Sequence, residues 1–262
     1  MLREAAARVA CRAVSHAPDA FRRRRARPAI VGHRGVRGAR PENSLAAIAE
    51  AARQGADAVE IDVRLCGSGE VIVLHDPSLA RVTGDPREAE ALSYAELSTL
   101  ALEGSDERVP RLEEALELSW ALGLGLNVEI KHDVRDRVAT VRAVARLLGA
   151  WRRAHDLVIS SFDPWTLLAH HALVPRRAHG LLVHRSWYRE LALGVARRAP
   201  LEGLHLTSEL VTGARVRALG ARRYLVTWTV NEPTEARRVA ALGVDAIITD
   251  RPALLREALD AG

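Results

Sequence analysis

Lysine is almost absent from this chain of 262 residues, because only one of its 38 basic side chains, that of Lys131, is a lysine. The sequence prefers arginine everywhere else, so this position is an exception. Lysine places a compact charge on a thin stem, whereas arginine presents a wide planar fork. We interpret Lys131 as part of a narrow site that admits an ammonium group and rejects a guanidinium. Chance retention in an arginine-biased chain is the alternative.

Cysteines and long apolar runs are also scarce. Cys11 and Cys66 are the only cysteines and lie far apart, so they form neither a disulfide framework nor the spacing of a zinc site. This usage is typical of a reducing compartment and predicts a cytoplasmic location. No apolar run approaches the roughly 18 residues that a membrane helix needs, so we expect no transmembrane segment.

The net charge of +5 at pH 7 suits nucleic acid, a membrane surface or a small anion as partner. Most arginines are spread along the chain and balanced by acidic residues. The exception is the run FRRRRAR at residues 21–27, which is typical of a nucleic-acid-binding arm or of a solvated tail. No aromatic side chains interleave with its arginines, which favours the tail, and nucleic acid is not the expected partner.

The domain organisation predicted from length and composition is a basic N-terminal extension, residues 1–27, followed by one domain, residues 28–262. The length allows one barrel-sized domain or two smaller ones, and no change of composition marks a second. The extension superficially resembles an organelle transit segment but lacks the apolar core of a secretory signal. We interpret it as a short helix or tail outside the main fold.

Short β-branched runs alternate with amphipathic segments from Ala29 onward, which predicts a parallel sheet with helices outside it. The predicted strands are Ala29–Gly35, Ala58–Val63, Val71–Asp76, Leu126–Lys131, Leu157–Phe162, His179–Val183, Gly203–Leu206, Tyr224–Val230 and Ala246–Asp250. Val63 and Val71 are separated by only seven residues, including the turn sequence Gly-Ser-Gly. A parallel crossover needs about a dozen residues, so the third strand should fold back antiparallel as a hairpin.

Without the hairpin strand, eight parallel strands remain. This number predicts a (β/α)8 TIM barrel with a small antiparallel hairpin after the second strand. A doubly wound open sheet is the alternative, but no glycine-rich dinucleotide loop follows the first strand.

Acidic side chains and the lone lysine share one face of two predicted strands. Glu60 and Asp62 point the same way, as do Glu129 and Lys131, because residues two apart in a strand share a face. Their apolar neighbours should meet the outer helices, which directs the charges into the barrel near its C-terminal mouth. Three buried carboxylates require compensation. We predict that Glu60, Asp62 and Glu129 hold one divalent cation, Mg2+ or Ca2+, since both prefer oxygen ligands. A buried network with Lys131 and arginines is the alternative.

Two histidines close predicted strands at the same end of the barrel. His33 ends the first strand and His75 ends the hairpin strand, so both lie near the carboxylates. Histidine is the natural proton donor and acceptor near neutral pH. Arg34 follows His33 and is suited to clamp an anion with two parallel hydrogen bonds. A cation, a lysine, an arginine and two histidines are the groups that phosphoryl chemistry uses.

These residues belong to a longer series of motifs. Together they read HRG (33–35), PENS (41–44), GAD (55–57), EIDV (60–63), VLHD (73–76), VEIK (128–131), SSF (160–162), VTWTVN (226–231) and GVDAIITDRP (243–252). The chain thereby resembles the glycerophosphodiester phosphodiesterase family over about 220 residues. One departure is the hairpin turn, where the family usually has Thr-x-Asp-Gly and this chain has Cys66-Gly67-Ser68-Gly69. That change removes no proposed catalytic group.

The resemblance implies a (β/α)8 barrel and a divalent-metal hydrolase. In the family, the residues matching His33 and His75 serve as acid and base, and those matching Glu60, Asp62 and Glu129 hold the metal. The residues matching Arg34 and Lys131 contact phosphate, and the one matching Trp228 packs on the substrate. Glu42 and Asn43 match a motif near the site, although they would also serve to cap the next helix.

The expected reaction is hydrolysis of a small-molecule glycerophosphodiester, a deacylated phospholipid head group, to glycerol 3-phosphate and an alcohol. The nucleophile is either water or the neighbouring glycerol hydroxyl, which gives a cyclic phosphate. Two alternatives remain, which are phospholipase D-like action on lysophospholipids and a non-catalytic barrel that binds a phosphodiester. The second needs no pair of histidines.

Overall fold

The computed structural model of this chain describes residues 18–23, 27–153, 156–184, 194, 198–220 and 223–261. Every predicted strand is present, and the strand ends differ from the prediction by a few residues. The strands are β1 (Ala29–His33), β2 (Ala58–Leu65), β3 (Val71–Val73), β4 (Gly125–Ile130), β5 (Leu157–Ser161), β6 (Ala178–Val183), β7 (Gly203–Thr207), β8 (Tyr224–Trp228) and β9 (Ala246–Thr249).

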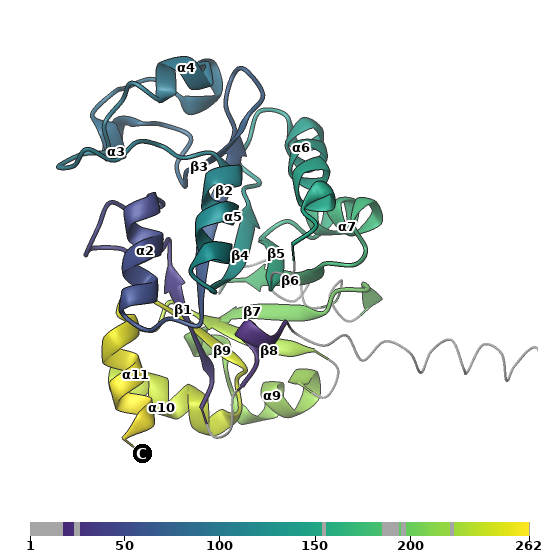
Figure 1. Cartoon of the computed structure of the whole chain (residues 1–262). Coiled ribbons are helices and arrows are strands. Elements are labelled where there is room, and N and C mark those ends of the chain that lie inside the picture. Colours follow the sequence, from purple (N-terminus) through teal and green to yellow (C-terminus); the bar gives the residue numbers. More distant parts are fainter. Residues whose placement is uncertain are drawn as a thin grey trace, which may run out of the picture.

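Helices follow most strands and lie around the outside of the sheet (Figure 1). The longer ones are α2 (Leu45–Arg53), α5 (Leu112–Ala121), α6 (Arg137–Ala150), α7 (Pro164–Leu173), α9 (Gly213–Gly220), α10 (Pro233–Leu242) and α11 (Pro252–Asp260). Short helices are α3 (Ala80–Thr83), α4 (Tyr94–Leu97) and the 3-10 turns η1 (Asp19–Phe21), η2 (Ala89–Ala91) and η3 (Ser208–Leu210). The Asp163 side chain caps α7 by accepting the N–H groups of Trp165 and Thr166, and Pro164 takes the first helical position, where no N–H is needed.

The sheet closes on itself. Its strand order is β1-β9-β8-β7-β6-β5-β4-β2-β3, and β1 also pairs with β2. Every pairing is parallel except β2 with β3. The predicted (β/α)8 barrel with its antiparallel hairpin is therefore confirmed, and the open doubly wound sheet is wrong.

The two faces of β2 separate apolar from charged side chains, as its alternation predicts. Val59, Ile61 and Val63 are fully buried and pack in the core between barrel and outer helices. Glu60 and Asp62 point to the other face, into the barrel. Below them, a smaller apolar cluster that includes Val31, Val158, Val226 and Ile248 fills the interior. The barrel interior is thus a packed apolar core with the acidic residues of β2 above it at the mouth.

The hairpin opens into a larger excursion at the mouth than the sequence predicts. Strand β3 ends at Val73, before the predicted end at Asp76. The chain then runs through α3, η2 and α4, and this segment has its own small apolar core. Members of this core are Cys66, Ile72, Leu74, Leu79, Ala89, Leu92, Leu97, Leu102 and Val109. The excursion carries His75 and Asp76 to the barrel mouth.

Part of the predicted N-terminal extension packs as a component of the barrel. Phe21 in η1 is 1% exposed and lies in the interior cluster, and the N–H of Ala20 donates to Asp156 at 2.8 Å. A side chain at Gly125 would lie 2.5 Å from the Ala20 side chain, so β4 needs a glycine here. Residues 19–21 are therefore not outside the main fold. Residues 1–17 and 24–26 lie outside the described residues, and the domain division at residue 28 remains a prediction.

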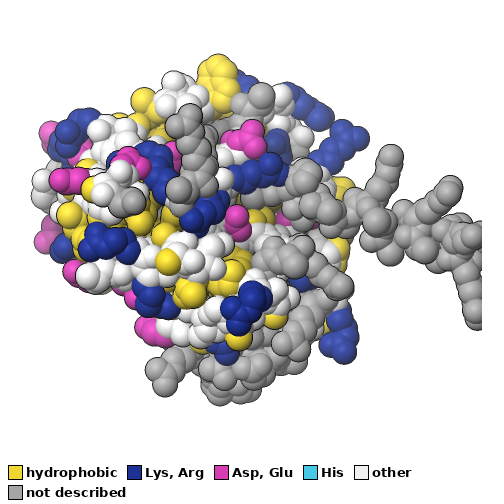
Figure 2. Space-filling model, turned by 90° about the horizontal axis from the view of Figure 1, so that it is seen from below, with side chains coloured by type: hydrophobic (Ala, Val, Ile, Leu, Met, Phe, Trp, Pro, Cys, Tyr) yellow, Lys and Arg dark blue, Asp and Glu magenta, His cyan; other side chains and the backbone are white. Residues whose placement is uncertain are grey.

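Basic side chains do not gather into one patch on the face seen in Figure 2, where they are interspersed with acidic and apolar ones. Within the basic run, Arg27 pairs with Asp57 and Asp260 at 3.3 and 2.9 Å. Arg27, at the end of this run, therefore forms ion pairs within the protein. Among the described helices, none combines the length and the apolar character that a membrane crossing requires.

Candidate active site at the barrel mouth

Three carboxylates meet where β2 and β4 end. The strand register places Asp62 beside Glu129 and Glu60 beside Asn127. Glu60, Asp62 and Glu129 are 4%, 1% and 7% exposed, and one oxygen from each lies within 4.8 Å of the others. The alternation of the two strands thus brings the three predicted acidic residues to one point.

Lys131 follows β4 directly and lies between two of these carboxylates. Its Nζ donates to Glu129 at 2.9 Å and to Asp62 at 3.3 Å, and the residue is 5% exposed. A guanidinium needs more width than this confined position between two carboxylates provides. The geometry therefore agrees with the interpretation drawn from the lone lysine.

The loop after β1 brings a second cation to the same carboxylates. Arg34 has a positive φ of 51°, its backbone N–H donates to Glu60 at 3.0 Å, and its Nε lies 3.3 Å from Asp62. Its Nη1 also donates to Glu42 at 2.8 Å. Positive φ is uncommon for a residue other than glycine and is over-represented at functional sites.

The side chains of Glu42 and Asn43 serve the site and do not cap the next helix. Asn43 has φ of 59°, donates to the Asp62 side chain at 3.0 Å and accepts the Asp62 N–H at 3.2 Å. Glu42 holds Arg34, whereas Ser44 is the residue that caps α2. The PENS motif (41–44) therefore connects strand β2 to the loop after β1.

The pKa values of the acidic residues diverge. Burial and the neighbouring carboxylates raise the pKa of Glu60 well above its ordinary value and that of Glu129 to about 7. Burial also disfavours the charge on Asp62, but Lys131 and Arg34 outweigh it and hold its pKa at about 2. Burial opposes the charge of Lys131 as well, yet Asp62 and Glu129 raise its pKa. Lys131 and Arg34 therefore keep Asp62 ionised, whereas Glu60 and Glu129 have too little positive charge nearby to offset the cost of burying their charges.

This imbalance is what a divalent cation would remove. The donor set is three carboxylates from two adjacent rigid strands, which suits a hard cation such as Mg2+ or Ca2+. A positive charge among them lowers the pKa values of Glu60 and Glu129 and keeps both ionised. The residues present therefore fit such an ion.

Each predicted histidine is held by an aspartate through Nδ1. His33 Nδ1 lies 2.7 Å from Asp250, and His75 Nδ1 lies 2.6 Å from Asp76. This contact orients each ring and leaves Nε2 for another partner. Burial lowers the pKa of His75, which favours the neutral form of the ring, the form that can accept a proton.

Arg64 holds the loop that carries His75. This fully buried side chain donates to the carbonyl oxygens of His75 and Leu74 at 2.7 and 3.4 Å, and also pairs with Glu90 and Asp133 at 3.1 Å. Sequence reasoning missed this residue, although it shares a strand face with Glu60 and Asp62. That shared face was the only available signal.

A cavity of about 100 Å³ joins these groups. Its lining consists of His33, Arg34, Glu60, Asp62, His75, Asn127, Glu129, Phe162, Leu182, Trp228, Thr229 and Ile248. Every predicted site residue except Lys131 lines it, and Lys131 contacts two residues that do. The ring of Phe162 packs edge to face against that of Trp228, with 5.4 Å between the ring centroids, and gives the cavity one apolar wall.

Asn127 is a second residue that the sequence reasoning missed. It is 1% exposed, lines the cavity, and neither atom of its amide has a partner among the described residues. Buried polar groups are normally paired, so this amide is available to a ligand. The missed signal was again alternation, since Asn127 shares its strand face with Glu129 and Lys131.

A family model for the glycerophosphoryl diester phosphodiesterase family matches residues 33–254. The chain belongs to this family. The resemblance drawn from the motifs is thereby confirmed, as is the prediction of an enzyme of this type at the level of the family.

Individual relatives agree. A glycerophosphodiester phosphodiesterase of Caldanaerobacter subterraneus subsp. tengcongensis is 28% identical over 86% of this chain and 95% of the relative. A probable glycerophosphodiester phosphodiesterase 2 of Mycobacterium tuberculosis is 30% identical over 87% of this chain and 89% of its own length. The solved structure of an Oleispira antarctica phosphodiesterase in complex with the product sn-glycerol-3-phosphate has a TM-score of 0.82 and 30% identity, covering 89% of this chain and 97% of that one.

The raised pKa of Glu129 predicts how stability depends on pH in the presence of chelator. Because the pKa rises from 4.5 to about 7, the folded state keeps a proton that the unfolded chain has released, and this contribution to stability is lost as pH rises through that range. Glu129→Gln has no such proton. Between about pH 5 and about pH 8 its free energy of unfolding should gain up to about 3 kcal/mol relative to wild type.

Urea unfolding of both proteins at the two pH values measures this difference, and titrating groups outside the acidic cluster cancel in the comparison. Saturating Mg2+ should abolish the relative gain, because the ion favours the ionised form of Glu129. A difference in unfolding free energy that does not change with pH in chelator would contradict this account of the acidic cluster.

Proposed function

We propose that this protein hydrolyses glycerophosphodiesters to glycerol 3-phosphate and an alcohol, with a divalent cation and two histidines. The observation that carries the proposal is the convergence on one small cavity of three buried carboxylates and two aspartate-held histidines. Membership of the family supports the reaction class, and the product complex of the Oleispira relative supports the glycerol 3-phosphate part of the substrate.

Glu60, Asp62 and Glu129 are the proposed ligands of one Mg2+ or Ca2+. Bound there, the ion would supply positive charge against the phosphate oxygens as negative charge develops on them. Arg34 and Lys131 are proposed to add to this charge, Arg34 from the cavity wall and Lys131 through the carboxylates it contacts.

His33 and His75 are the proposed acid and base. One accepts the proton of the attacking oxygen, which forms the new bond to phosphorus, and the other protonates the alcohol oxygen as its bond to phosphorus breaks. The lowered pKa of His75 supports it as the base. Trp228 with Phe162 is proposed to pack against the carbon skeleton of the substrate. A cytoplasmic location remains part of the proposal, supported by cysteine usage.

The first test is release of glycerol 3-phosphate from glycerophosphocholine and glycerophosphoethanolamine with Mg2+, with Ca2+ and with chelator. We expect turnover with at least one of the ions and none in chelator, because Glu60 and Glu129 need a counter-charge to remain ionised. Lysophosphatidylcholine serves as the comparison substrate. Faster turnover of the lysolipid would favour phospholipase D-like action, and a folded, metal-loaded protein that turns over no diester would be a binder.

Removing either histidine should slow catalysis without preventing folding. We expect His33→Asn and His75→Asn each to lower kcat by about 10²–10⁴-fold, the range for a lost general acid or base. A substrate with p-nitrophenol as leaving group needs no protonation of that group. It should restore much of the rate to the variant that lacks the acid and none to the variant that lacks the base. Equal kcat for wild type and either variant on natural substrates would remove that histidine from the mechanism.

Exchanging the single lysine for arginine tests the requirement for a compact charge. We expect Lys131→Arg to lower kcat by about 10²-fold or more, because the wider guanidinium would displace Asp62 and Glu129 from their positions in the site. The matched control is the reverse exchange at an exposed position, Arg137→Lys, which should leave kcat unchanged. Melting temperatures establish that both variants fold. Retention of wild-type turnover by Lys131→Arg would show that charge alone, and not shape, is needed here.

A further inference from the structure

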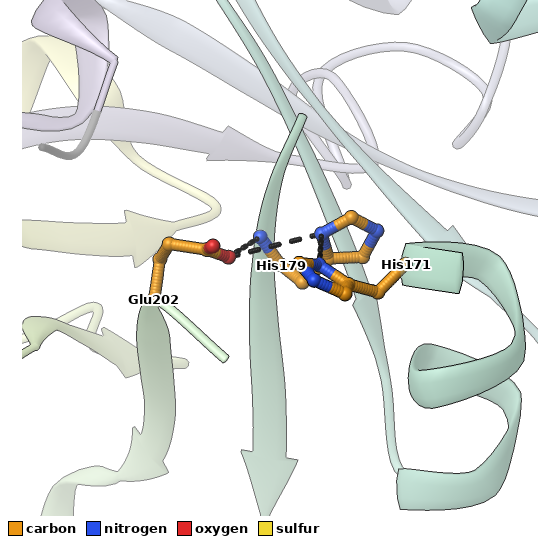
Figure 3. A group of neighbouring side chains, drawn as sticks. All are labelled: His171, His179 and Glu202. Carbon is orange, nitrogen blue, oxygen red and sulfur yellow. Dashed lines mark hydrogen bonds and ion pairs between the residues drawn. The ribbon is translucent and has the colours of Figure 1, made fainter. Parts of the chain in front are cut away.

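A second cluster of metal-binding side chains lies at the opposite end of the barrel. His171 is near the end of α7, His179 is near the start of β6, and Glu202 directly precedes β7 (Figure 3). The starts of the strands are the end of the barrel away from the mouth. Active sites of (β/α)8 barrels lie at the mouth, whereas residues at the other end contribute to the stability of the fold.

The three side chains converge at distances that suit one ion. His171 Nδ1 lies 3.3 Å from His179 Nδ1, which in turn lies 3.7 Å from Glu202 Oε2, and one ligand atom from each residue lies within 4.8 Å of the others. Zinc with bonds of about 2.0–2.1 Å in a tetrahedral site places its ligand atoms about 3.4 Å apart. Two of the pairs are therefore already close to the spacing of a zinc site.

Two further contacts hold His179 in the orientation that binding would need. Its backbone N–H donates to Glu202 Oε2 at 2.8 Å, which fixes the carboxylate beside the ring. Its Nε2 lies 2.9 Å from Nδ1 of His170, a fully buried residue. When Nε2–H donates to His170, the lone pair of His179 is on Nδ1, the atom that faces His171 and Glu202. A ligating histidine typically donates its other N–H to such an outer partner.

His170, which supports His179, is itself incompletely paired. Its Nε2 is buried and has no partner among the described residues. Leaving a buried polar atom unpaired is costly, so a cluster that served packing alone would be better built from apolar side chains. His171 and Glu202 are both partly exposed, which gives an ion a path from solvent.

We propose that His171, His179 and Glu202 form a zinc site in which water completes the coordination. Two imidazoles and one carboxylate are a ligand set that zinc takes and that Mg2+ and Ca2+ disfavour. The site ties the end of α7 to the β6–β7 edge of the barrel, so zinc stabilises the fold. It is separate from the carboxylates at the mouth and does not depend on the proposed function.

The test is zinc binding by the full-length protein after removal of metals, measured by calorimetry in a buffer with millimolar Mg2+ to fill the mouth site. We expect one tightly bound zinc ion per chain and a rise in melting temperature. His171→Ala and Glu202→Gln should each weaken zinc binding at least about tenfold and abolish the rise in melting temperature. Both residues are partly exposed, and glutamine retains an acceptor for the His179 N–H, so both variants are expected to fold.

Two control variants separate this site from the others. His184→Ala removes an exposed histidine that lies against Trp228 at the mouth, and Glu129→Gln alters the carboxylates there. Both should keep the zinc ion and its effect on melting. Zinc binding that survives His171→Ala and Glu202→Gln, or that disappears in Glu129→Gln, would overturn the proposal, as would the absence of tight binding by wild type.

Discussion

Burying three carboxylates at one point is the constraint on which the mouth of this barrel depends. Desolvating a charge costs several kcal/mol, so Glu60, Asp62 and Glu129 cannot all remain ionised without positive charge nearby. Lys131 and Arg34 provide part of that charge, enough to keep Asp62 ionised. The remaining imbalance is the basis of the proposal that the site binds a divalent cation, and a substrate phosphate would add its own negative charge to the same balance.

Much of the surrounding architecture serves to hold these charges. Arg34 and Asn43 adopt positive φ, which directs a backbone N–H to Glu60 and a side-chain amide to Asp62. Such backbone conformations cost on the order of 1–3 kcal/mol each and persist where the surroundings enforce them. Arg64 fixes the loop of His75 from inside the same strand that carries the carboxylates. The three carboxylates and the proposed proton-transfer groups are thus positioned by the adjacent strands β2 and β4, the end of β1 and the loop after β3.

The barrel was predictable from the number of strands, the hairpin from its short connection, and the meeting of Glu60, Asp62 and Glu129 from alternation, because all three are local properties of the sequence. Partners distant in the chain were not predictable in this way. Asp250 holds His33 across 217 residues, and nothing in either motif specifies that pair. Phe21 was assigned to a tail because its arginine-rich neighbours dominate the composition, whereas its burial depends on the space left by Gly125. The excursion after β3 is held by apolar contacts among segments too short to show a clear period.

We propose that the carboxylate cluster binds a single divalent cation, which completes its charge balance. Calorimetric titration of Mg2+ and Ca2+ into chelator-treated wild type and Glu60→Gln tests it most directly. We expect one ion per wild-type chain and an affinity reduced at least about tenfold in Glu60→Gln, because one of the three proposed carboxylate ligands is then neutral. Equal affinity in the two proteins, or no binding by the wild type, would contradict it.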